Sequence, residues 1–277
     1  MVELFKDDFY VFGNPIYHTK SPYIHKLFSI QTGISYKYSS KLVPLNEFKN
    51  YMIDFFLNNG KGANITVPFK EEAYFFSHVL TDRAKMSGSV NTFKKLKNNL
   101  ILGDNTDGIG IFYDLRRINF ITKIRNNVLL IGAGGAARGI IFTLLSFGCN
   151  IVIVNRTISK VKCLLECFKN KIGSISIFND DLRLNYHFDL IINATVNLYF
   201  NPDLDRIKCF INKDICCYDI NYLKKNKNTS FILWCLENGA VRISNGIGML
   251  VSQAAYSFYL WYGFLPNIDE VINILVK

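Results

Sequence analysis

A glycine-rich turn between an apolar strand and an apolar helix constrains the fold of this chain more than any other feature. Residues 132–137 read Gly-Ala-Gly-Gly-Ala-Ala, which matches the pattern G-x-G-x-x-G/A, and they follow the apolar run 128–131 directly. In such a turn, glycines let backbone N–H groups approach a pyrophosphate, and the helix N-terminus adds unpaired donors and a partial positive charge. This context favours a Rossmann-like dinucleotide site over a tight turn without a ligand. The residues expected at the cofactor are Gly132, Ala133, Gly134, Gly135 and Ala136.

The residues after the next strand indicate which dinucleotide binds. Asn155, Arg156 and Thr157 follow the strand 151–154, and Lys160 lies one helical turn onward. A site for NAD usually carries a carboxylate here, which binds the ribose 2′-hydroxyl and would repel a 2′-phosphate. An arginine instead accepts that phosphate through two hydrogen bonds. We therefore expect NADP as the cofactor; a solvated arginine at a strand end is the alternative interpretation.

Strand and helix signals alternate along both halves of the chain, which predicts an α/β fold with largely parallel sheets. In the first third, strands near 10–12, 36–41, 63–67, 90–95 and 100–103 alternate with helices over 21–31, over 45–58 and from Pro68. A second alternating block spans 128–220, and helices over 231–237, over 247–262 and from Ile268 follow it. We expect two domains: a substrate domain over 1–105 and 245–277, and a dinucleotide-binding domain over 106–244.

The composition is that of a folded cytoplasmic protein with a small-molecule substrate. The 277 residues are 49% hydrophobic and 19% charged, and 32 basic against 22 acidic residues give a net charge of +10. The lysines are scattered and form no basic stripe with interleaved aromatics, so no nucleic-acid partner is expected. A positive field instead favours small anionic substrates. The seven cysteines have no zinc spacing and there is no signal peptide, which predicts reduced thiols in the cytoplasm and no metal.

One segment, residues 247–265, carries no charge and is long enough to cross a membrane. However, Gly248 and Gly263 stand near its ends, and the polar residues Ser252, Gln253 and Ser257 lie within it. The rest of the chain follows an α/β pattern. We therefore expect a buried helix here and no membrane partner.

Two charged residues near helix starts are the catalytic candidates. Lys70 opposes the dipole of a helix that begins at Pro68, and residues that break such local rules are frequent at functional sites. A lysine there is also easier to deprotonate, which suits proton transfer to an alkoxide; pairing with a neighbouring glutamate is the structural alternative. Asp107 also lies at a helix start, where a structural role is common, and spacing alone does not choose between it and Asp104.

Taken together, these motifs closely resemble the shikimate dehydrogenase family, and the likeness covers essentially the whole chain. The matching stretches are GNPIYHTKSPYIH (13–25), GANITVPFKEEA (62–73), SVNTF (89–93), GDNTDGIG (103–110), IGAGGAARG (131–139), NRT (155–157), DLIINAT (189–195) and NGIGMLVSQAA (245–255). The resemblance implies reversible reduction of 3-dehydroshikimate to shikimate by NADPH, in aromatic amino-acid biosynthesis.

The resemblance also assigns residue roles. Lys70 would exchange a proton with the C3 oxygen, and Asp107, now favoured over Asp104, would orient it and bind a substrate hydroxyl. Other residues would hold the substrate: Asn64, Thr66, Asn91 and Gln253 its ring hydroxyls, Thr19 and Ser21 its carboxylate, with Tyr222 lining the site. Thr195, Ile220 and Gly246 would complete the cofactor site.

The chain departs from the family pattern at a few positions. Thr19 replaces a usual serine, Ile220 a usual methionine and Lys160 a frequent arginine, and the sequence 196–198 is Val-Asn-Leu where small residues and glycine are common. None of these changes removes a catalytic atom, although each allows a lower affinity or turnover.

Two other functions compete with this interpretation. A quinate/shikimate enzyme that tolerates NAD usually has an acid after the arginine, whereas Thr157 follows here. A catalytically inactive nucleotide-binding protein is disfavoured because Lys70, Asp107 and Gln253 are intact. A monomer or a homodimer is expected.

Overall fold

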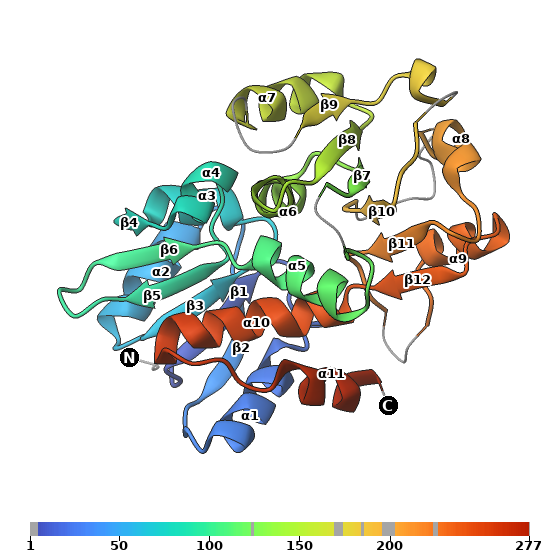
Figure 1. Ribbon diagram of the computed structural model, residues 1–277. Helices are drawn as coiled ribbons and strands as arrows, with labels where there is room; N and C mark the ends of the chain where they lie inside the picture. Colours follow the sequence, from blue (N-terminus) through green and yellow to red (C-terminus); the bar gives the residue numbers. More distant parts are fainter. Residues whose placement is uncertain are drawn as a thin grey trace. The chain divides into compact units, whose positions relative to one another are not determined.

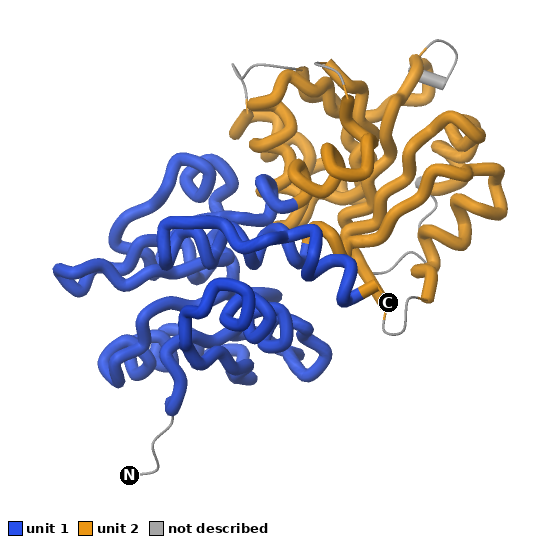
Figure 2. The backbone as a smooth tube through the Cα atoms, turned by 60° about the horizontal axis from the view of Figure 1, so that its bottom comes forward, with its two compact units in different colours: residues 1–110, 250–275, 277 blue, residues 111–249, 276 orange. Residues whose placement is uncertain are grey.

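The computed structural model describes residues 5–122, 125–168, 174–183, 186–195, 203–223 and 227–276 (Figure 1). The chain divides into two compact units, which Figure 2 colours separately. The first unit contains the residues up to 110 together with 250–275, and the second contains 111–249.

The first unit is built on a six-stranded mixed sheet in the order β2-β1-β3-β5-β6-β4. β1 pairs in parallel with β2 and β3, and β4 pairs in parallel with β6, whereas β5 runs antiparallel to β3 and β6. The strands are β1 (Phe9–Gly13), β2 (Tyr38–Leu42), β3 (Gly62–Ile65), β4 (Val79–Leu80), β5 (Thr92–Lys95) and β6 (Ile101–Asp104). The helices are α1 (Ser21–Thr32), α2 (Phe48–Leu57), α3 (Lys70–Phe76), α4 (Asp82–Ser87) and α11 (Ile268–Val276).

Two further helices cross the unit boundary along the chain, α5 (Asp107–Arg117) and α10 (Ile247–Tyr262). α10 is the uncharged segment that imitates a membrane span. Its residues Val251, Ala254 and Phe258 are fully buried, which explains its apolar composition. No helix in the described part of the chain is both long and apolar enough to cross a membrane.

Aromatic side chains fill one face of the first sheet. Phe12 on β1 and Phe55 on α2 meet edge to face at 5.3 Å, and Phe48 stacks on Phe69 at 5.1 Å. All four side chains are at most 1% exposed. Burial of large rings contributes much of the hydrophobic stabilisation of a core. The same packing fixes the segment between β3 and α3, because Phe69 is the residue that caps α3.

The second unit is a Rossmann-like layer structure. Its six strands are all parallel, in the order β9-β8-β7-β10-β11-β12, which is the 3-2-1-4-5-6 order of dinucleotide-binding folds. The strands are β7 (Asn127–Ile131), β8 (Asn150–Val154), β9 (Ile175–Ile177), β10 (Leu190–Asn193), β11 (Cys216–Asp219) and β12 (Arg242–Asn245). The helices are α6 (Gly135–Ser146), α7 (Ile158–Phe168), α8 (Asp203–Ile207) and α9 (Ser230–Glu237).

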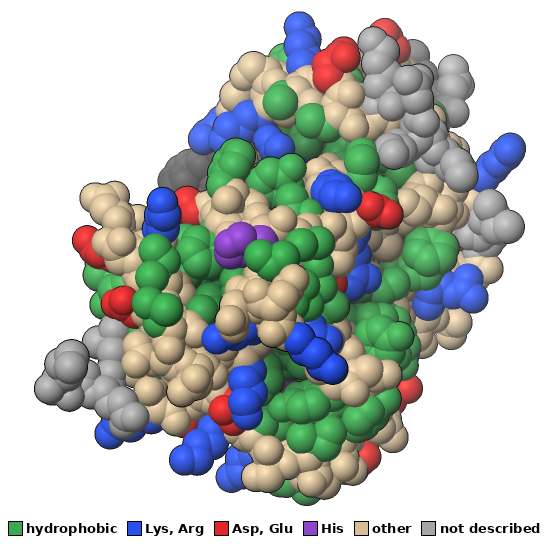
Figure 3. Space-filling view, turned by 90° about the vertical axis from the view of Figure 1, so that its left-hand side faces the viewer, with side chains coloured by type: hydrophobic (Ala, Val, Ile, Leu, Met, Phe, Trp, Pro, Cys, Tyr) green, Lys and Arg blue, Asp and Glu red, His purple; other side chains and the backbone are tan. Residues whose placement is uncertain are grey.

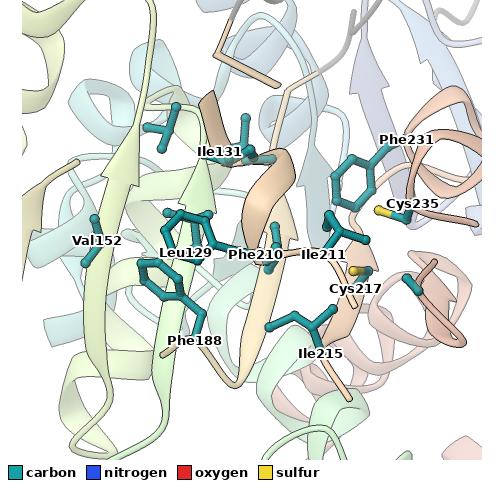
Figure 4. Close-up of a cluster of buried hydrophobic side chains, with 14 of the residues drawn as sticks. Leu129, Ile131, Val152, Phe188, Phe210, Ile211, Ile215, Cys217, Phe231 and Cys235 are labelled. Carbon is teal, nitrogen blue, oxygen red and sulfur yellow. The ribbon is translucent and has the colours of Figure 1, made fainter. Parts of the chain in front are cut away.

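One buried cluster packs against this parallel sheet (Figure 4). Leu129 and Ile131 of β7 join Ile191 of β10 and Phe231 of α9, and all four are fully buried. Strands covered on both faces need apolar residues at successive positions, which accounts for the continuous apolar runs that made these strands detectable.

The predicted α/β class is therefore confirmed, with corrections at short elements. The strands β4 and β12 and the helices α4 and α8 were not predicted, and α3 begins at Lys70 rather than at Pro68. Lys and Arg side chains lie scattered over the face of the molecule that Figure 3 shows. Within the described residues, no group of three or more His, Cys, Asp or Glu side chains is placed to hold a metal ion.

Candidate active site

Lys70 and Asp107 form a shielded ion pair in the first unit. Lys70 is the first residue of α3, just after β3, and Asp107 is the first residue of α5, just after β6. The Lys70 Nζ donates to Asp107 Oδ2 at 2.6 Å, and the two side chains are 18% and 7% exposed. The lysine therefore pairs with a residue far away in the sequence rather than with the glutamates that follow it. An ammonium held in this way can exchange a proton with an oxygen placed beside it.

Asp104 is held by different partners. Its carboxylate is fully buried and accepts hydrogen bonds from the Arg83 Nε at 2.7 Å and from the Thr81 hydroxyl at 2.5 Å. A second guanidinium nitrogen of Arg83 completes the ion pair with Asp104. This arrangement anchors the start of α4 to the end of β6. The geometry therefore places Asp107, and not Asp104, beside Lys70.

Asn91 joins the ion pair to the polar residues around it. Its Nδ2 donates to Asp107 Oδ1 at 2.7 Å and to the Thr106 hydroxyl at 3.0 Å. Its Oδ1 accepts from the Thr106 backbone N–H at 2.8 Å, which fixes the orientation of the amide. Gln253 of α10 lies at the edge of this group, with its Oε1 3.5 Å from the Asn91 Nδ2.

Asn64 is the second buried amide of the site. It lies near the end of β3 and is 6% exposed. Its Nδ2 donates to the Ser257 hydroxyl at 2.8 Å and contacts the Asn91 carbonyl oxygen at 3.2 Å. Thr66 follows two residues later and is half-buried; its backbone N–H donates to the Phe12 carbonyl at 2.9 Å.

The two hydroxyl residues expected at the substrate carboxylate lie together at the start of α1. Thr19 Oγ1 donates to Ser21 Oγ at 3.1 Å and accepts from the Ser21 backbone N–H at 3.2 Å. Thr19 carries a methyl group that serine lacks, but its hydroxyl still lies next to Ser21.

Several residues of this polar group escaped the sequence analysis. The hydroxyls of Thr92 and Ser257 lie 2.8 Å apart, and both contact the Asn64 amide. Ser257 was detectable, because it follows Gln253 by four positions on an otherwise apolar helix and so shares its face. Tyr38, which donates to Asn64 Oδ1 at 2.8 Å, gave no signal because it lies on another strand.

The glycine turn of the second unit has the geometry that a pyrophosphate needs. Gly132 has a φ of 110°, and a Cβ there would lie 2.9 Å from Thr195 Cγ2. Gly134 and Gly135, in contrast, border open space, because an added Cβ would meet no protein atom within 4 Å. α6 begins at Gly135, and its first N–H groups have no acceptor within the helix. The residues present therefore fit a dinucleotide.

The end of β8 presents a cationic group to solvent. Asn155 Nδ2 donates to the Thr157 carbonyl at 2.9 Å, which turns the chain after the strand. Arg156, Thr157 and Lys160 are exposed, so the guanidinium is accessible to a phosphate.

The ends of β10 and β11 position the remaining cofactor candidates. Asn193 Oδ1 accepts from the Thr195 hydroxyl at 2.7 Å, while its Nδ2 donates to Asp219 at 2.9 Å. Gly246 passes so close to Ile220 that an added Cβ would lie 2.0 Å from the Ile220 carbonyl oxygen. Tyr222 is half-buried, and burial raises its pKa. The predicted loop 196–198 lies outside the described residues.

The strand order, the glycine turn and the exposed arginine define a nicotinamide-nucleotide-dependent oxidoreductase. Three family models match the chain: "Shikimate dehydrogenase substrate binding domain" over residues 11–93, "Shikimate / quinate 5-dehydrogenase" over 116–200 and "Shikimate 5'-dehydrogenase C-terminal domain" over 246–275. The chain belongs to the shikimate dehydrogenase family.

Individual relatives span the whole chain. It is 65% identical to a shikimate dehydrogenase (NADP(+)) of Buchnera aphidicola subsp. Baizongia pistaciae, over 98% of this chain and 96% of that protein. The counterpart from Buchnera aphidicola subsp. Schizaphis graminum is 49% identical, with 99% of each chain covered.

Solved structures share the fold over the same length. An Ael1 enzyme from Pseudomonas putida is 33% identical, with a TM-score of 0.86 and 98% and 99% of the two chains covered. A shikimate dehydrogenase in complex with NADP+ is 28% identical, with a TM-score of 0.82 and 97% and 94% coverage. The Thermus thermophilus shikimate 5-dehydrogenase in complex with shikimate is 26% identical, with a TM-score of 0.81 and 96% of each chain covered.

Proposed function

We propose that this enzyme catalyses the reversible NADPH-dependent reduction of 3-dehydroshikimate to shikimate. The observation that carries the proposal is the 2.6 Å contact between Lys70 and Asp107, in a chain whose relatives are named shikimate dehydrogenase (NADP(+)). A ketone reduction needs a proton donor beside the oxygen that becomes an alkoxide, and a paired ammonium meets that need.

In this proposal, different residues of the first unit transfer the proton and bind the substrate. NADPH supplies the hydride. Lys70 gives the matching proton to the C3 oxygen in the reduction and accepts it in the oxidation, while Asp107 keeps the ammonium in place and binds a hydroxyl. The residues that hold the rest of the substrate are Asn64, Thr66, Asn91 and Gln253 for the ring hydroxyls and Thr19 and Ser21 for the carboxylate. The role of Tyr222 as a residue that lines the substrate site stays a prediction.

The second unit supplies the cofactor site in this proposal. The turn 132–136 binds the pyrophosphate, and Asn155, Arg156, Thr157 and Lys160 bind the adenosine end with its 2′-phosphate. Thr195, Ile220 and Gly246 bind the nicotinamide half. Support comes from the open space at Gly134 and from the exposed Arg156 guanidinium. The cytoplasmic location and the monomeric or dimeric state stay predictions.

Absorbance at the NADPH band tests the function directly. Wild-type protein mixed with shikimate and NADP+ should form NADPH, and Lys70→Ala should lower kcat roughly 100- to 10,000-fold, the usual contribution of general acid–base catalysis. Lys85→Ala is the control, because Lys85 lies exposed on α4, 3.7 Å from Asp82, and should keep full activity. No NADPH from wild-type protein, or an undiminished rate in Lys70→Ala, would contradict the proposal.

A second candidate, oxidation of quinate with NAD, has support in the family model named for both substrates. Against it, the position after Arg156 holds Thr157, which lacks the carboxylate that an NAD ribose would use. A rate with quinate and NAD that equals the rate with shikimate and NADP would favour this candidate.

A further inference from the structure

Tyr38 reaches across the first sheet to the buried amide of Asn64. β2 and β3 flank β1, with Tyr38 paired to Phe9 and Asn64 paired to Val11. The Tyr38 hydroxyl donates to Asn64 Oδ1 at 2.8 Å. The Asn64 Nδ2 faces acceptors on its other side, with the Ser257 oxygen at 2.8 Å. The Asn91 carbonyl oxygen, 3.2 Å from Nδ2, can only accept and so decides which end of the amide carries the NH2 group, while the Tyr38 hydroxyl holds the other end by donating to Oδ1.

The ring of Tyr38 is held by His25 of α1. The two rings stack with centroids 3.9 Å apart and an interplanar angle of 12°. Tyr36 donates its hydroxyl proton to the His25 carbonyl at 2.9 Å, so the Tyr36 oxygen, 2.9 Å from His25 Nδ1, must accept there. His25 thus carries its proton on Nδ1. Burial lowers its pKa to about 3, so a neutral ring supports Tyr38 at ordinary pH.

The Tyr38 hydroxyl remains a donor at ordinary pH. Burial raises the pKa of Tyr38 well above its usual value, so the hydroxyl keeps the proton that Asn64 Oδ1 accepts.

We propose that Tyr38, stacked on His25, is a positioning residue that holds the Asn64 amide in place and so sets the affinity for the substrate. This inference rests on the proposed function, in which Asn64 binds a ring hydroxyl of the substrate. Tyr38 acts through Asn64, and it takes no part in the proton transfer at Lys70.

The test is Tyr38→Phe, which removes the hydroxyl and keeps the stacked ring. The KM for shikimate should rise roughly 10-fold, the usual effect of leaving a buried polar group without its partner. The kcat and the KM for NADP+ should stay within about a factor of two, because neither the proton donor nor the cofactor site changes. Tyr10→Phe is the matched control: Tyr10 is a buried tyrosine of the same sheet whose hydroxyl accepts from the Lys6 backbone N–H at 3.1 Å.

A double-mutant cycle identifies the residue through which Tyr38 acts. In an Asn64→Ala background, Tyr38→Phe should add almost nothing to the rise in KM, because the shared partner is gone. Fully additive effects, or an equal rise in KM in Tyr10→Phe, would overturn the proposal.

A measurement without substrate separates this inference from the proposed function. The side-chain amide signals of Asn64, assigned by their loss in Asn64→Ala, should shift in the NMR spectrum of Tyr38→Phe and stay in place in Tyr10→Phe. Unchanged Asn64 signals in Tyr38→Phe would refute the positioning role, even if wild-type protein turned out to act on another substrate.

Discussion

The buried imidazole of His25 should make the stability of the protein depend on pH. Its side chain is almost completely shielded from solvent, with the residue 1% exposed. Burial lowers its pKa from 6.5 to about 3, although the Asn64 side chain opposes this shift. Between pH 6.5 and about 3, His25 is therefore protonated in the unfolded chain and neutral in the folded protein. The stability that neutral His25 provides is complete above pH 6.5 and is lost as the pH falls toward 3.

The effect should be measurable by urea unfolding at several pH values. Each pH unit below 6.5 costs about 1.4 kcal/mol, so His25 should account for about 2 kcal/mol of lost stability between pH 6.5 and 5. His25→Gln removes the titrating group and should flatten the pH dependence by that amount, whatever its stability at pH 7. His18→Gln, at an exposed histidine, should keep the wild-type slope. An unchanged slope in His25→Gln would contradict this assignment.

The sequence identified a single functional residue only where its interaction partner lay nearby in the sequence or where the residue broke a local preference, such as that for acidic residues at a helix start. Lys70 was detectable because it opposes the dipole of its helix. Asp104 and Asp107 looked equivalent because their partners, Arg83 and Lys70, come from other elements. The stacking of His25 on Tyr38 was beyond prediction for the same reason, since sequence spacing carries no information on contacts between α1 and β2.

The contact between α5 and α10 depends on a glycine. A Cβ on Gly110 would lie 2.7 Å from the backbone nitrogen of Gln253 and 2.9 Å from its Cα, and a helix backbone cannot yield locally. Gly110→Ala should therefore push this part of α10 away and displace Gln253 from Asn91. We expect a loss of about 1–3 kcal/mol in the free energy of unfolding, as for other overpacked sites, and a raised KM for shikimate. Urea unfolding and initial rates measure the two effects; wild-type values for both would show that the helices tolerate the methyl group.

Elements were predictable in proportion to their length and periodicity. The long helix α10 was predicted with its observed bounds, and the buried strands β7 and β8 were recognised from continuous apolar runs. β4 has two residues, too few to establish any period, and β12 has none fully buried, with Arg242 exposed. These short strands form because a neighbouring strand offers backbone partners, as β11 does for β12. That pairing is a tertiary property.

At the scale of the whole molecule, two units with separate sheets imply two separately measurable ligand sites. Each unit has its own hydrophobic core, and the polar group around Lys70 and the glycine turn lie in different units. A ligand stabilises the protein by an amount set by its concentration relative to its Kd, about 2.7 kcal/mol at 100 times Kd. Shikimate and NADP+ should therefore each raise the Tm alone, and hydrogen exchange should slow around 63–70 and 89–107 with shikimate and around 128–136 and 154–160 with NADP+.

Arg156→Asp should separate these two responses. The substitution changes an exposed position, so the fold should persist. It places a carboxylate where the proposed function puts the 2′-phosphate. Loss of charge-assisted hydrogen bonds of about 1.5–3 kcal/mol corresponds to a 10- to 100-fold weaker affinity for NADP+, before repulsion by the new carboxylate is added. At a fixed NADP+ concentration, the Tm shift and the protection around 128–136 should fall well below their wild-type values, whereas both responses to shikimate should match wild type. Wild-type protection by NADP+, or an unchanged preference for NADP over NAD, would show that another group binds the 2′-phosphate.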